Sequence, residues 1–271
     1  MLFRSSMSIP SVLKKIIATK HDEIAAGRYR TPRAELRSRA GDAAPTRGFA
    51  AALNSCMARG TAVIAEVKKA SPSAGVIRAD FRPDDIARAY QVAGAACLSV
   101  LTDTLYFKGH LDDLGTARNA CELPVLRKDF IVDPWQLLQS RCAGADCILL
   151  IVAALGHSQL QDLCGEALEW GLDVLVEVHD EAEMETALTL GDVCLLGVNN
   201  RNLHDFTTDL AISERLRELL PDERALITES GIRAPADVAR MRAAGIHAFL
   251  VGEAFMREED PGEALRELFA A

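Results

Sequence analysis

This chain of 271 residues lacks the marks of a membrane or secreted protein. No apolar run approaches the roughly 18 residues that a membrane-spanning helix needs. The opening segment MLFRSSMSIPSVLKK has neither a continuous apolar stretch nor a small-residue cleavage site, so we expect no secretory signal and treat Met7 as an alternative start. The seven cysteines form no C-x-x-C pair, and their number is odd. We therefore predict a cytoplasmic protein with reduced cysteines in its core.

Motifs for several kinds of chemistry are also missing. The six histidines show no H-x-x-x-H or H-E-x-x-H spacing, and no acidic cluster resembles a hard-cation site, so we predict no metal and no cofactor. No serine stands in a G-x-S-x-G elbow. Residues 48–271 carry 20 Lys and Arg against 35 Asp and Glu, which argues against nucleic acid as a partner. An anionic small molecule would need a local positive site on this acidic surface.

Lysine is scarce, since it supplies only seven of the 30 basic residues. Beyond Arg47 the lysines are Lys68, Lys69, Lys108 and Lys128. A guanidinium stays charged, whereas a buried ammonium can give up a proton or bond covalently to a carbonyl. Lysine in an arginine-rich chain therefore indicates proton transfer or nucleophilic chemistry. For Lys69 and Lys108, a simple solvated side chain is an equal alternative.

Eight short apolar runs indicate the fold. They alternate with amphipathic stretches that open on Pro or Asp and end near Gly. The runs are nearly continuous, as in buried parallel strands, and cover residues 62–67, 97–101, 124–128, 147–152, 173–178, 193–198, 225–229 and 248–252. This pattern predicts an α/β fold, a (β/α)8 TIM barrel. An open, doubly wound sheet is the alternative, weakened because no G-x-G-x-x-G follows the first run.

An N-terminal helical extension precedes the barrel. Apolar residues of the segment SIPSVLKKIIATKHDEIAAG recur at helical spacing, with Ser11 as a cap and Gly27 as a stop. A polar, Arg-rich connector follows to about Arg47. We therefore divide the chain into an extension over residues 1–47, which covers the barrel mouth, and a barrel over residues 48–271. We expect a monomer or a weak homodimer.

In a (β/α)8 barrel the chemistry lies at the carboxyl ends of the strands. Lys68 and Lys128 stand at two such ends, and Glu177 stands in an apolar run where a carboxylate is costly unless paired or protonated. Glu66 points to the same side of its strand as Lys68, so pairing with a lysine is expected. Asn199 serves either as an orienting amide or as a loop cap.

A phosphate site is predicted after the last two strands. The segments TESGI and LVGEAF each place Gly before a helix start, and backbone N–H groups exposed there bind phosphate. The strand-end residues of this region are Glu229, Ser230, Gly231, Gly252 and Glu253.

Seven segments in order carry a resemblance to a known family: IAEVKKASPSAG, SVLTDTLYFKG, LPVLRKDFIVDPWQL, GLDVLVEVHDEAE, GVNNRNL, ITESGI and FLVGEAFM. Nearly the whole chain resembles indole-3-glycerol phosphate synthase of tryptophan biosynthesis, in a form without an isomerase domain. The resemblance implies a carboxy-lyase that closes 1-(2-carboxyphenylamino)-1-deoxyribulose 5-phosphate to indole-3-glycerol phosphate, with loss of CO₂ and water. The implied partner is this small anionic substrate.

The resemblance also implies roles for individual residues. Lys128 corresponds to the general acid at the substrate carbonyl, and Lys68 to the cation that holds the anthranilate carboxylate. Glu177 takes the second acid/base role, in the dehydration half, with Glu66 and Asn199 nearby. The implied binding residues are Ser71, Phe107, Phe130, Arg201, Glu229, Ser230, Gly231, Gly252 and Glu253. His110 departs from the family pattern, which usually has Ser there, so the detail of the second loop is open.

Two neighbouring lysines are expected to lower each other's pKa, which would make Lys128 a readier proton donor. Two other functions stay open at this point. One is a Schiff-base aldolase in which Lys128 attacks a carbonyl, and the other is a non-catalytic barrel that binds a phosphate ligand.

Overall fold

The structure, a computed structural model, describes residues 11–270, so Met7 and the first part of the extension lie outside the described residues. Eight parallel strands close into a barrel, each paired with its neighbour along the chain and the last paired with the first. They are β1 (Ala62–Val67), β4 (Cys97–Leu101), β5 (Val125–Lys128), β6 (Cys147–Ile151), β7 (Asp173–Val178), β8 (Leu195–Asn199), β9 (Leu226–Glu229) and β10 (Ala248–Val251). The predicted TIM barrel is confirmed, and the open sheet is wrong.

Helices follow the strands and cover the outside of the barrel. They are α4 (Pro83–Val92), α5 (Leu111–Ala120), α6 (Pro134–Ala143), α7 (His157–Glu169), α8 (Glu181–Leu188), α9 (Ala211–Arg217), α10 (Pro235–Ala243), the short α11 (Glu253–Met256) and α12 (Pro261–Phe269). Helices α4, α6, α10 and α12 begin with Pro in the first turn, because that position needs no N–H donor. The minor elements are the hairpin β2 (Ala70–Ser71) and β3 (Gly75–Val76) and the 3₁₀ turns η1 (Val152–Ala154) and η2 (Gly191–Val193).

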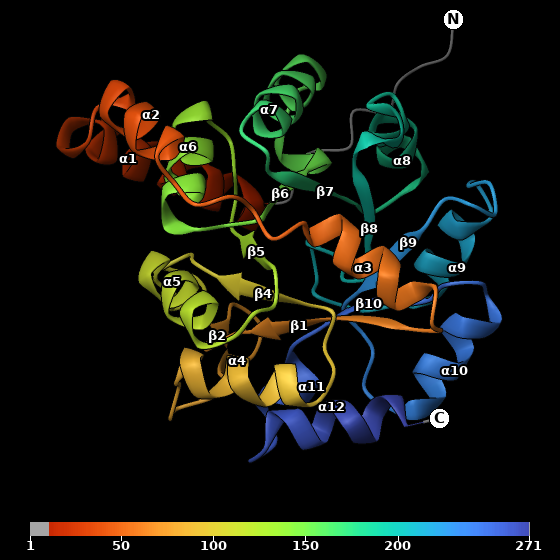
Figure 1. Cartoon of the computed structure of the whole chain (residues 1–271). Helices are drawn as coiled ribbons and strands as arrows, with labels where there is room; N and C mark the ends of the chain where they lie inside the picture. The colour runs from red at the N-terminus through yellow and green to blue at the C-terminus, as the bar shows by residue number, and fades with distance from the viewer. Residues whose placement is uncertain (1–10, 271) are drawn as a thin grey trace, which may run out of the picture.

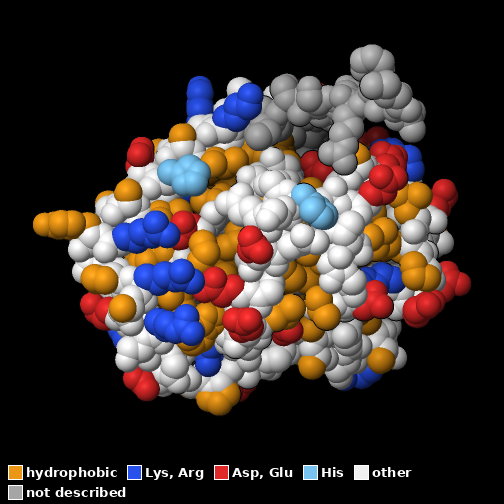
Figure 2. Space-filling model, turned by 90° about the horizontal axis from the view of Figure 1, so that it is seen from above, with side chains coloured by type: hydrophobic (Ala, Val, Ile, Leu, Met, Phe, Trp, Pro, Cys, Tyr) orange, Lys and Arg blue, Asp and Glu red, His pale blue; other side chains and the backbone are white. Residues whose placement is uncertain are grey.

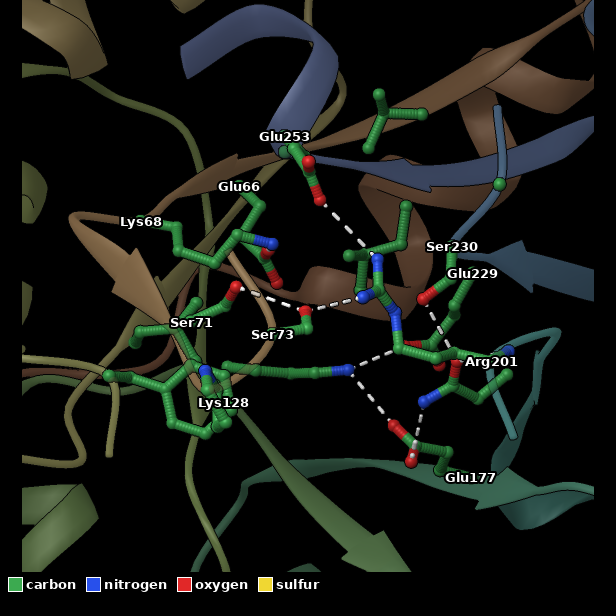
Figure 3. Close-up of a pocket in the computed structure, with 18 of the residues that line it drawn as sticks. Glu66, Lys68, Ser71, Ser73, Lys128, Glu177, Arg201, Glu229, Ser230 and Glu253 are labelled. Carbon is green, nitrogen blue, oxygen red and sulfur yellow. Dashed lines mark hydrogen bonds and ion pairs between the residues drawn. The ribbon is translucent and has the colours of Figure 1, made fainter. Parts of the chain in front are cut away.

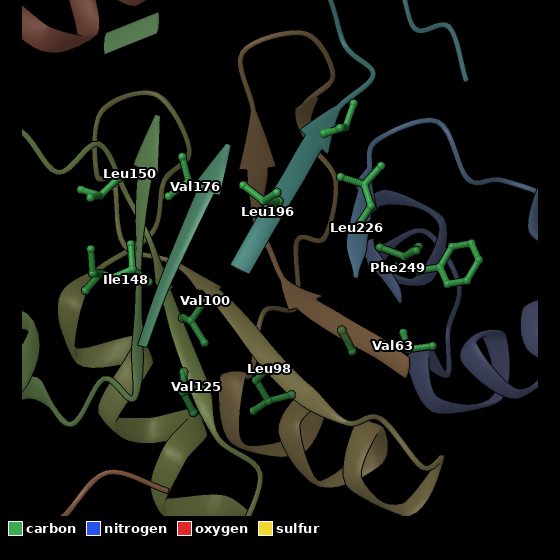
Figure 4. Packing of buried hydrophobic residues seen from close by; sticks show 14 of the residues in the cluster. Val63, Leu98, Val100, Val125, Ile148, Leu150, Val176, Leu196, Leu226 and Phe249 are labelled. Atoms are coloured by element: carbon green, nitrogen blue, oxygen red, sulfur yellow. The ribbon is translucent and has the colours of Figure 1, made fainter. Parts of the chain in front are cut away.

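Each barrel strand is buried on both faces, which explains its continuous apolar run. One face packs against the outer helices and includes Val63, Leu98 and Val176 (Figure 4). The other face fills the barrel interior and includes Ile64, Leu126, Leu175 and Ile227. Because side chains alternate along a strand, the residue two positions beyond each of these interior residues points into the carboxyl end of the barrel.

Helices α1 (Ser11–Arg30) and α2 (Arg33–Gly41) form the N-terminal extension and pack against α6 (Figure 1). The prediction that Gly27 stops the first helix is wrong, because α1 continues to Arg30. Gly27 instead faces the Trp135 ring, where an added Cβ would lie 2.5 Å from Cη2. The predicted connector contains α2, whose buried Leu36 and Ala40 pack in the same cluster as Trp135.

Helix α3 (Phe49–Met57), which the sequence analysis does not predict, closes the amino end of the barrel. Its buried Phe49 and Leu53 belong to the interior cluster. Two strand-start carboxylates hold the segment, since Asp146 accepts from the backbone N–H of Arg47 at 2.7 Å and Asp173 accepts from that of Ala50 at 2.9 Å. Figure 1 shows orange α3 crossing the barrel, away from the red α1 and α2. The boundary at residue 47 stays a prediction.

The surface seen in Figure 2 mixes Lys and Arg side chains with Asp and Glu, with apolar patches between them. This face therefore presents no broad surface of a single charge. Within residues 11–270, every helix is too short or too polar to serve as a membrane span.

Candidate active site

One cavity of about 390 Å³ opens at the carboxyl ends of the strands, and its lining includes all fourteen residues singled out from the sequence. This volume lies in the range of small-molecule sites. They are Glu66, Lys68, Ser71, Phe107, Lys128, Phe130, Glu177, Asn199, Arg201, Glu229, Ser230, Gly231, Gly252 and Glu253. Glu66, Lys128, Glu177 and Glu229 meet here because each stands two positions beyond an interior apolar residue of its strand.

Lys128 lies between two carboxylates at the centre of the cavity (Figure 3). Its Nζ is 3.0 Å from Glu177 Oε2 and 2.5 Å from Glu229 Oε2. The exposed fraction is 13% for the lysine side chain and 4% and 2% for Glu177 and Glu229. The three groups therefore form a nearly dry cluster with one positive and up to two negative charges.

The charge state of Lys128 differs from the expectation. Burial acts to lower the pKa of Lys128, but the charges of Glu177, Glu229 and Glu66 outweigh it and raise the pKa above its ordinary value of 10.5. The predicted lowering by a neighbouring lysine is wrong, because Lys68 pairs with its own carboxylate and both of the ion pairs of Lys128 are to glutamates. Lys128 is therefore a charged ammonium.

The two carboxylates on Lys128 have opposite pKa shifts. Burial acts to raise the pKa of Glu177, but Lys128, His179 and a hydrogen bond from Asn199 hold it at about 2. Burial raises the pKa of Glu229 to about 7, opposed by Lys128 and reinforced by the charge of Glu177. Among residues 11–270 the buried Glu229 Oε1 has no hydrogen-bond partner, and it lies against Gly197, where a side chain would collide with it. Glu229 is thus the carboxyl that can hold a proton near neutral pH.

Lys68 and Glu66 form a second pair, as the sequence predicted. Lys68 Nζ lies 2.7 Å from Glu66 Oε1. Gly252 leaves the space for this carboxylate, since an added Cβ there would lie 2.5 Å from Glu66 Oε1. Gly252 therefore has a packing role at the barrel rim that the sequence analysis did not anticipate.

Asn199 combines the two alternatives left open for it. Its amide Nδ2 donates to Glu177 Oε1 at 3.2 Å, which orients the carboxylate. Its Oδ1 accepts from Ser230 Oγ at 2.9 Å and from the backbone N–H of Arg201 at 3.1 Å, which fixes the loops after β8 and β9.

The loop after β9 has an unusual backbone conformation. Ser230 and Gly231 both have positive φ angles, 62° and 91°. Ser230 is a non-glycine residue in this strained region, and such residues are frequent at functional sites.

Arg201 reaches the same end of the cavity. Its guanidinium donates to Ser73 Oγ at 2.7 Å and to Glu253 Oε2 at 3.3 Å. Glu253 also contacts Arg257 at 2.7 Å. Glu253 therefore holds Arg201 in place.

An apolar wall faces the charged cluster. Phe107 and Phe130 lie 6.2 Å apart between ring centroids, at an interplanar angle of 41°. From the extension, Val12, Leu13 and Ile16 line the cavity, and from the loop after β8, Leu203 and Phe206 do so. The sequence analysis placed the extension over the barrel mouth but did not single out these α1 residues, because periodicity does not reveal which side chains of a helix reach a cavity. It also missed Ser73, Arg233 and Arg257, which line the cavity from loops.

His110 does not line the cavity. It is the N-cap of α5, where its Nδ1 accepts from the backbone N–H of Asp112 at 3.2 Å and Asp113 completes the capping box. His110 thus supplies the acceptor that a serine would supply at a helix start. Among residues 11–270 no group of three His, Cys, Asp or Glu side chains is arranged to hold a metal ion.

Two solved structures share the fold. Tryptophan synthase subunit alpha from Legionella pneumophila str. Paris is 16% identical, with a TM-score of 0.59 over 83% of this chain and 96% of that chain. A protein from Aquifex aeolicus VF5 is 14% identical, with a TM-score of 0.58 over 82% of this chain and 97% of that chain. A family model described as indole-3-glycerol phosphate synthase matches residues 13–268, nearly the whole chain. The chain therefore belongs to the indole-3-glycerol phosphate synthase family.

Proposed function

We propose that this protein closes 1-(2-carboxyphenylamino)-1-deoxyribulose 5-phosphate to indole-3-glycerol phosphate, with release of CO₂ and water, by acid–base catalysis from lysine and glutamate. The family is one of tryptophan biosynthesis. The observation that carries the proposal is the buried cluster of Lys128, Glu177 and Glu229 at the barrel mouth, opposite an aromatic wall. A buried titratable cluster of this kind is typical of an acid–base site.

The substrate has a carboxylate on its aromatic ring and a phosphate at its other end. We assign the substrate carboxylate to Lys68, whose ammonium group is already held in position by its ion pair with Glu66. We assign the phosphate to the turn at Ser230 and Gly231, with Arg201 nearby. Anchoring both ends of the substrate bends the carbon chain between them and brings the aromatic ring close to the ketone. The aromatic ring then lies against Phe107 and Phe130.

In the first half of the reaction the ring carbon that bears the carboxylate attacks the ketone carbon. Lys128 donates its proton to the ketone oxygen, so that the oxygen becomes a hydroxyl and no alkoxide forms. Proton transfer of this kind contributes about 10²–10⁴-fold in rate. The carbon–carbon bond to the carboxylate then breaks, CO₂ leaves, and its electron pair restores the aromatic ring.

In the second half the hydroxyl leaves as water, and a proton leaves the neighbouring carbon of the newly formed five-membered ring. In this half the proton given to the hydroxyl is balanced by the proton taken from carbon. The net uptake is therefore the one proton that Lys128 gives to the ketone in the first half, and solvent replaces it. Glu177, ionised at neutral pH, is suited to accept the proton from carbon. Glu229, with a pKa of about 7, supplies a second protonated group close by.

The charged state of Lys128 weighs against a Schiff-base aldolase, because a nucleophilic lysine needs a neutral amine. Incubation with substrate and borohydride should therefore leave Lys128 unmodified. The intact cluster likewise weighs against a non-catalytic barrel, since a ligand scaffold has no need of buried titratable groups.

The test is a fluorescence assay for the indole product with purified protein and substrate. Lys128→Met should lower kcat by about 10³-fold or more, because the proton donor is lost. The matched control Lys108→Met changes an exposed lysine in the loop after β4 and should keep wild-type turnover. Substrate binding by the wild type without turnover would favour the scaffold, and near-normal turnover of Lys128→Met would refute the role of this lysine.

A further inference from the structure

His179 lies next to Glu177 and has no function in the mechanism above. It follows β7 and stands two residues beyond Glu177, so the two side chains leave the chain on the same side. The ring Nε2 lies 3.5 Å from Glu177 Oε1. Within residues 11–270 this buried nitrogen has no hydrogen-bond partner, and its polar contact is the ion pair with Glu177. His179 does not line the cavity, so it can influence the reaction only through Glu177.

The orientation of the His179 ring is set from its other edge. Nδ1 lies 3.0 Å from Glu183 Oε2, and the backbone N–H of His179 donates to the same oxygen at 2.8 Å. Glu183 is itself placed in the first turn of α8, where its backbone N–H donates to Asp180 Oδ1 at 2.9 Å. With Nδ1 held by Glu183, Nε2 is directed at Glu177.

The surroundings favour the imidazolium form. Carboxylates face the ring from three elements: Glu177 on β7, Glu183 on α8 and Glu229 on β9. Lys128 on β5 lies on the far side of Glu177 and is the opposing positive charge. Burial acts to lower the pKa of His179, but the Glu183 hydrogen bond and the three carboxylates outweigh it and raise the pKa above 6.5.

We propose that His179, as an imidazolium, is a positioning residue that holds the Glu177 carboxylate in place through the ion pair between Nε2 and Oε1. The inference rests on the proposed function. Glu177 then has Lys128 at one oxygen and both Asn199 and His179 at the other.

The physical reason for a second cation lies in the reaction itself. When Lys128 gives its proton to the ketone, its charge disappears and Glu177 loses its nearest counter-ion. A buried carboxylate without a counter-ion takes up a proton. The imidazolium of His179 keeps a positive charge beside Glu177 at that moment, so Glu177 is still ionised when the dehydration half needs a base.

Two substitutions distinguish the contact of Nε2 with Glu177 from the contact of Nδ1 with Glu183. His179→Gln places an amide N–H near the position of Nε2 and keeps a neutral donor toward Glu177. His179→Asn is too short to reach Glu177 but keeps a donor near the position of Nδ1, toward Glu183. We expect His179→Asn to lower kcat by about 10–100-fold with KM within about twofold, because Glu177 is misplaced and the substrate anchors are not. His179→Gln should lose less, about two- to fivefold at pH 7, since a neutral donor toward Glu177 remains although the positive charge is lost.

The pH profile provides a readout that a merely structural role would not change. In the wild type, kcat should fall as pH rises through the pKa of His179, because the imidazolium is lost. His179→Gln should lack this limb. Glu183→Gln removes one carboxylate and should move the limb to lower pH. An NMR titration of the His179 ring, assigned by its absence in His179→Asn, should show a lower pKa in Glu177→Gln than in wild type.

Wild-type activity of His179→Asn would overturn the proposal, and so would an unchanged pH profile in His179→Gln. Equal losses in both variants together with a lower Tm would also overturn it, because the ring would then matter only for packing. Absence of turnover in the wild type would instead contradict the proposed function. In that case the NMR titration still decides whether His179 and Glu177 are coupled.

Discussion

At the scale of single residues, the site depends on how three carboxylates share two lysines. Lys68 pairs with Glu66, whereas Lys128 is shared between Glu177 and Glu229. One lysine cannot neutralise two carboxylates, so the more poorly solvated of the two retains a proton to higher pH. That carboxyl is Glu229, whose Oε1 has no hydrogen-bond partner in the part of the chain that the structure describes.

The raised pKa of Glu229 predicts a pH-dependent stability. Its pKa is about 7 when folded, against 4.5 when free, so between these values the folded protein binds a proton that the unfolded chain does not. The contribution of Glu229 to the free energy of unfolding is therefore fully present below about pH 4.5 and is lost as pH rises to about 7. Glu229→Gln should remove this loss. Relative to wild type, the variant should gain on the order of 1–3 kcal/mol between pH 5 and pH 8 in denaturant titrations. A constant difference between the two proteins would contradict the assignment.

At the scale of elements, Lys20 fastens α1 to the barrel mouth. This lysine is 2% exposed, and its Nζ lies 2.7 Å from Asp103 Oδ2 and 3.1 Å from Asp129 Oδ1. Asp103 Oδ1 accepts from the backbone N–H of Phe107 at 3.1 Å, and Asp129 Oδ1 accepts from that of Phe130 at 2.8 Å. One side chain of the extension therefore connects to both aromatic residues of the cavity wall.

Lys20→Met should destabilise the protein by about 3–5 kcal/mol, because two buried aspartates lose their shared counter-ion. KM should also rise, since the loops that carry Phe107 and Phe130 lose a common support. Denaturant unfolding and steady-state kinetics measure the two effects. Lys15→Met, at an exposed position of the same helix, serves as the matched control and should change neither quantity. A rise in KM without loss of stability would contradict the ion-pair explanation.

A pair of glycines tests the crossing of α1 and α6. Gly27→Ala would place a methyl group 2.5 Å from the Trp135 ring, which is 5% exposed and tied to the Thr31 carbonyl through Nε1 at 3.0 Å. We expect a loss of about 1–3 kcal/mol, because the overpacking outweighs the gain of about 1 kcal/mol in helix propensity.

The matched control is Gly165→Ala on α7, where nothing lies within 4 Å of the added Cβ. This change should stabilise the protein by about 0.5–1 kcal/mol. Thermal unfolding of both variants measures the difference, and stabilisation by Gly27→Ala would mean that the two helices separate easily.

At the scale of the whole molecule, parts of the same N-terminal segment lie at both ends of the barrel. Helix α3 fills the amino end, and α1 contributes to the cavity lining at the carboxyl end. The interior between them is apolar from Phe49 up to Leu250 and becomes charged only at the rim. A closed interior of this kind concentrates the polar groups at one end.

Thiol reactivity should report this closure. Five of the seven cysteines are buried, and Cys56 and Cys142 are half-buried. The native protein should react with at most two equivalents of a thiol reagent, because the other thiols are sealed between strands and helices. All seven should react in strong denaturant, where the barrel has opened. Rapid reaction of more than two thiols in native buffer would indicate an open barrel.

Much of the architecture could be predicted from the sequence because it depends on local pattern. The continuous apolar runs gave all eight barrel strands, with shifts of one or two residues at their ends, as at β8, where the η2 turn comes first. Helices α2 and α3 were missed, since one is rich in Arg and the other is short and lies before the repeating pattern begins.

The sequence by itself determined that the strand-end side chains meet at one rim, because strand number and the alternation of side chains are local properties, and lysine scarcity marked the two rim lysines. Only the tertiary structure decided their charges. Whether Lys128 faces another lysine or two glutamates depends on which strands face one another across the barrel. It also depends on Gly197 and Gly252, which leave room for the carboxylates of Glu229 and Glu66. The electrostatic interaction between the lysine and its two glutamates depends on the burial of these residues and on the distances between them. The residues lie about 50 to 100 positions apart in the sequence, so no local pattern contains this information.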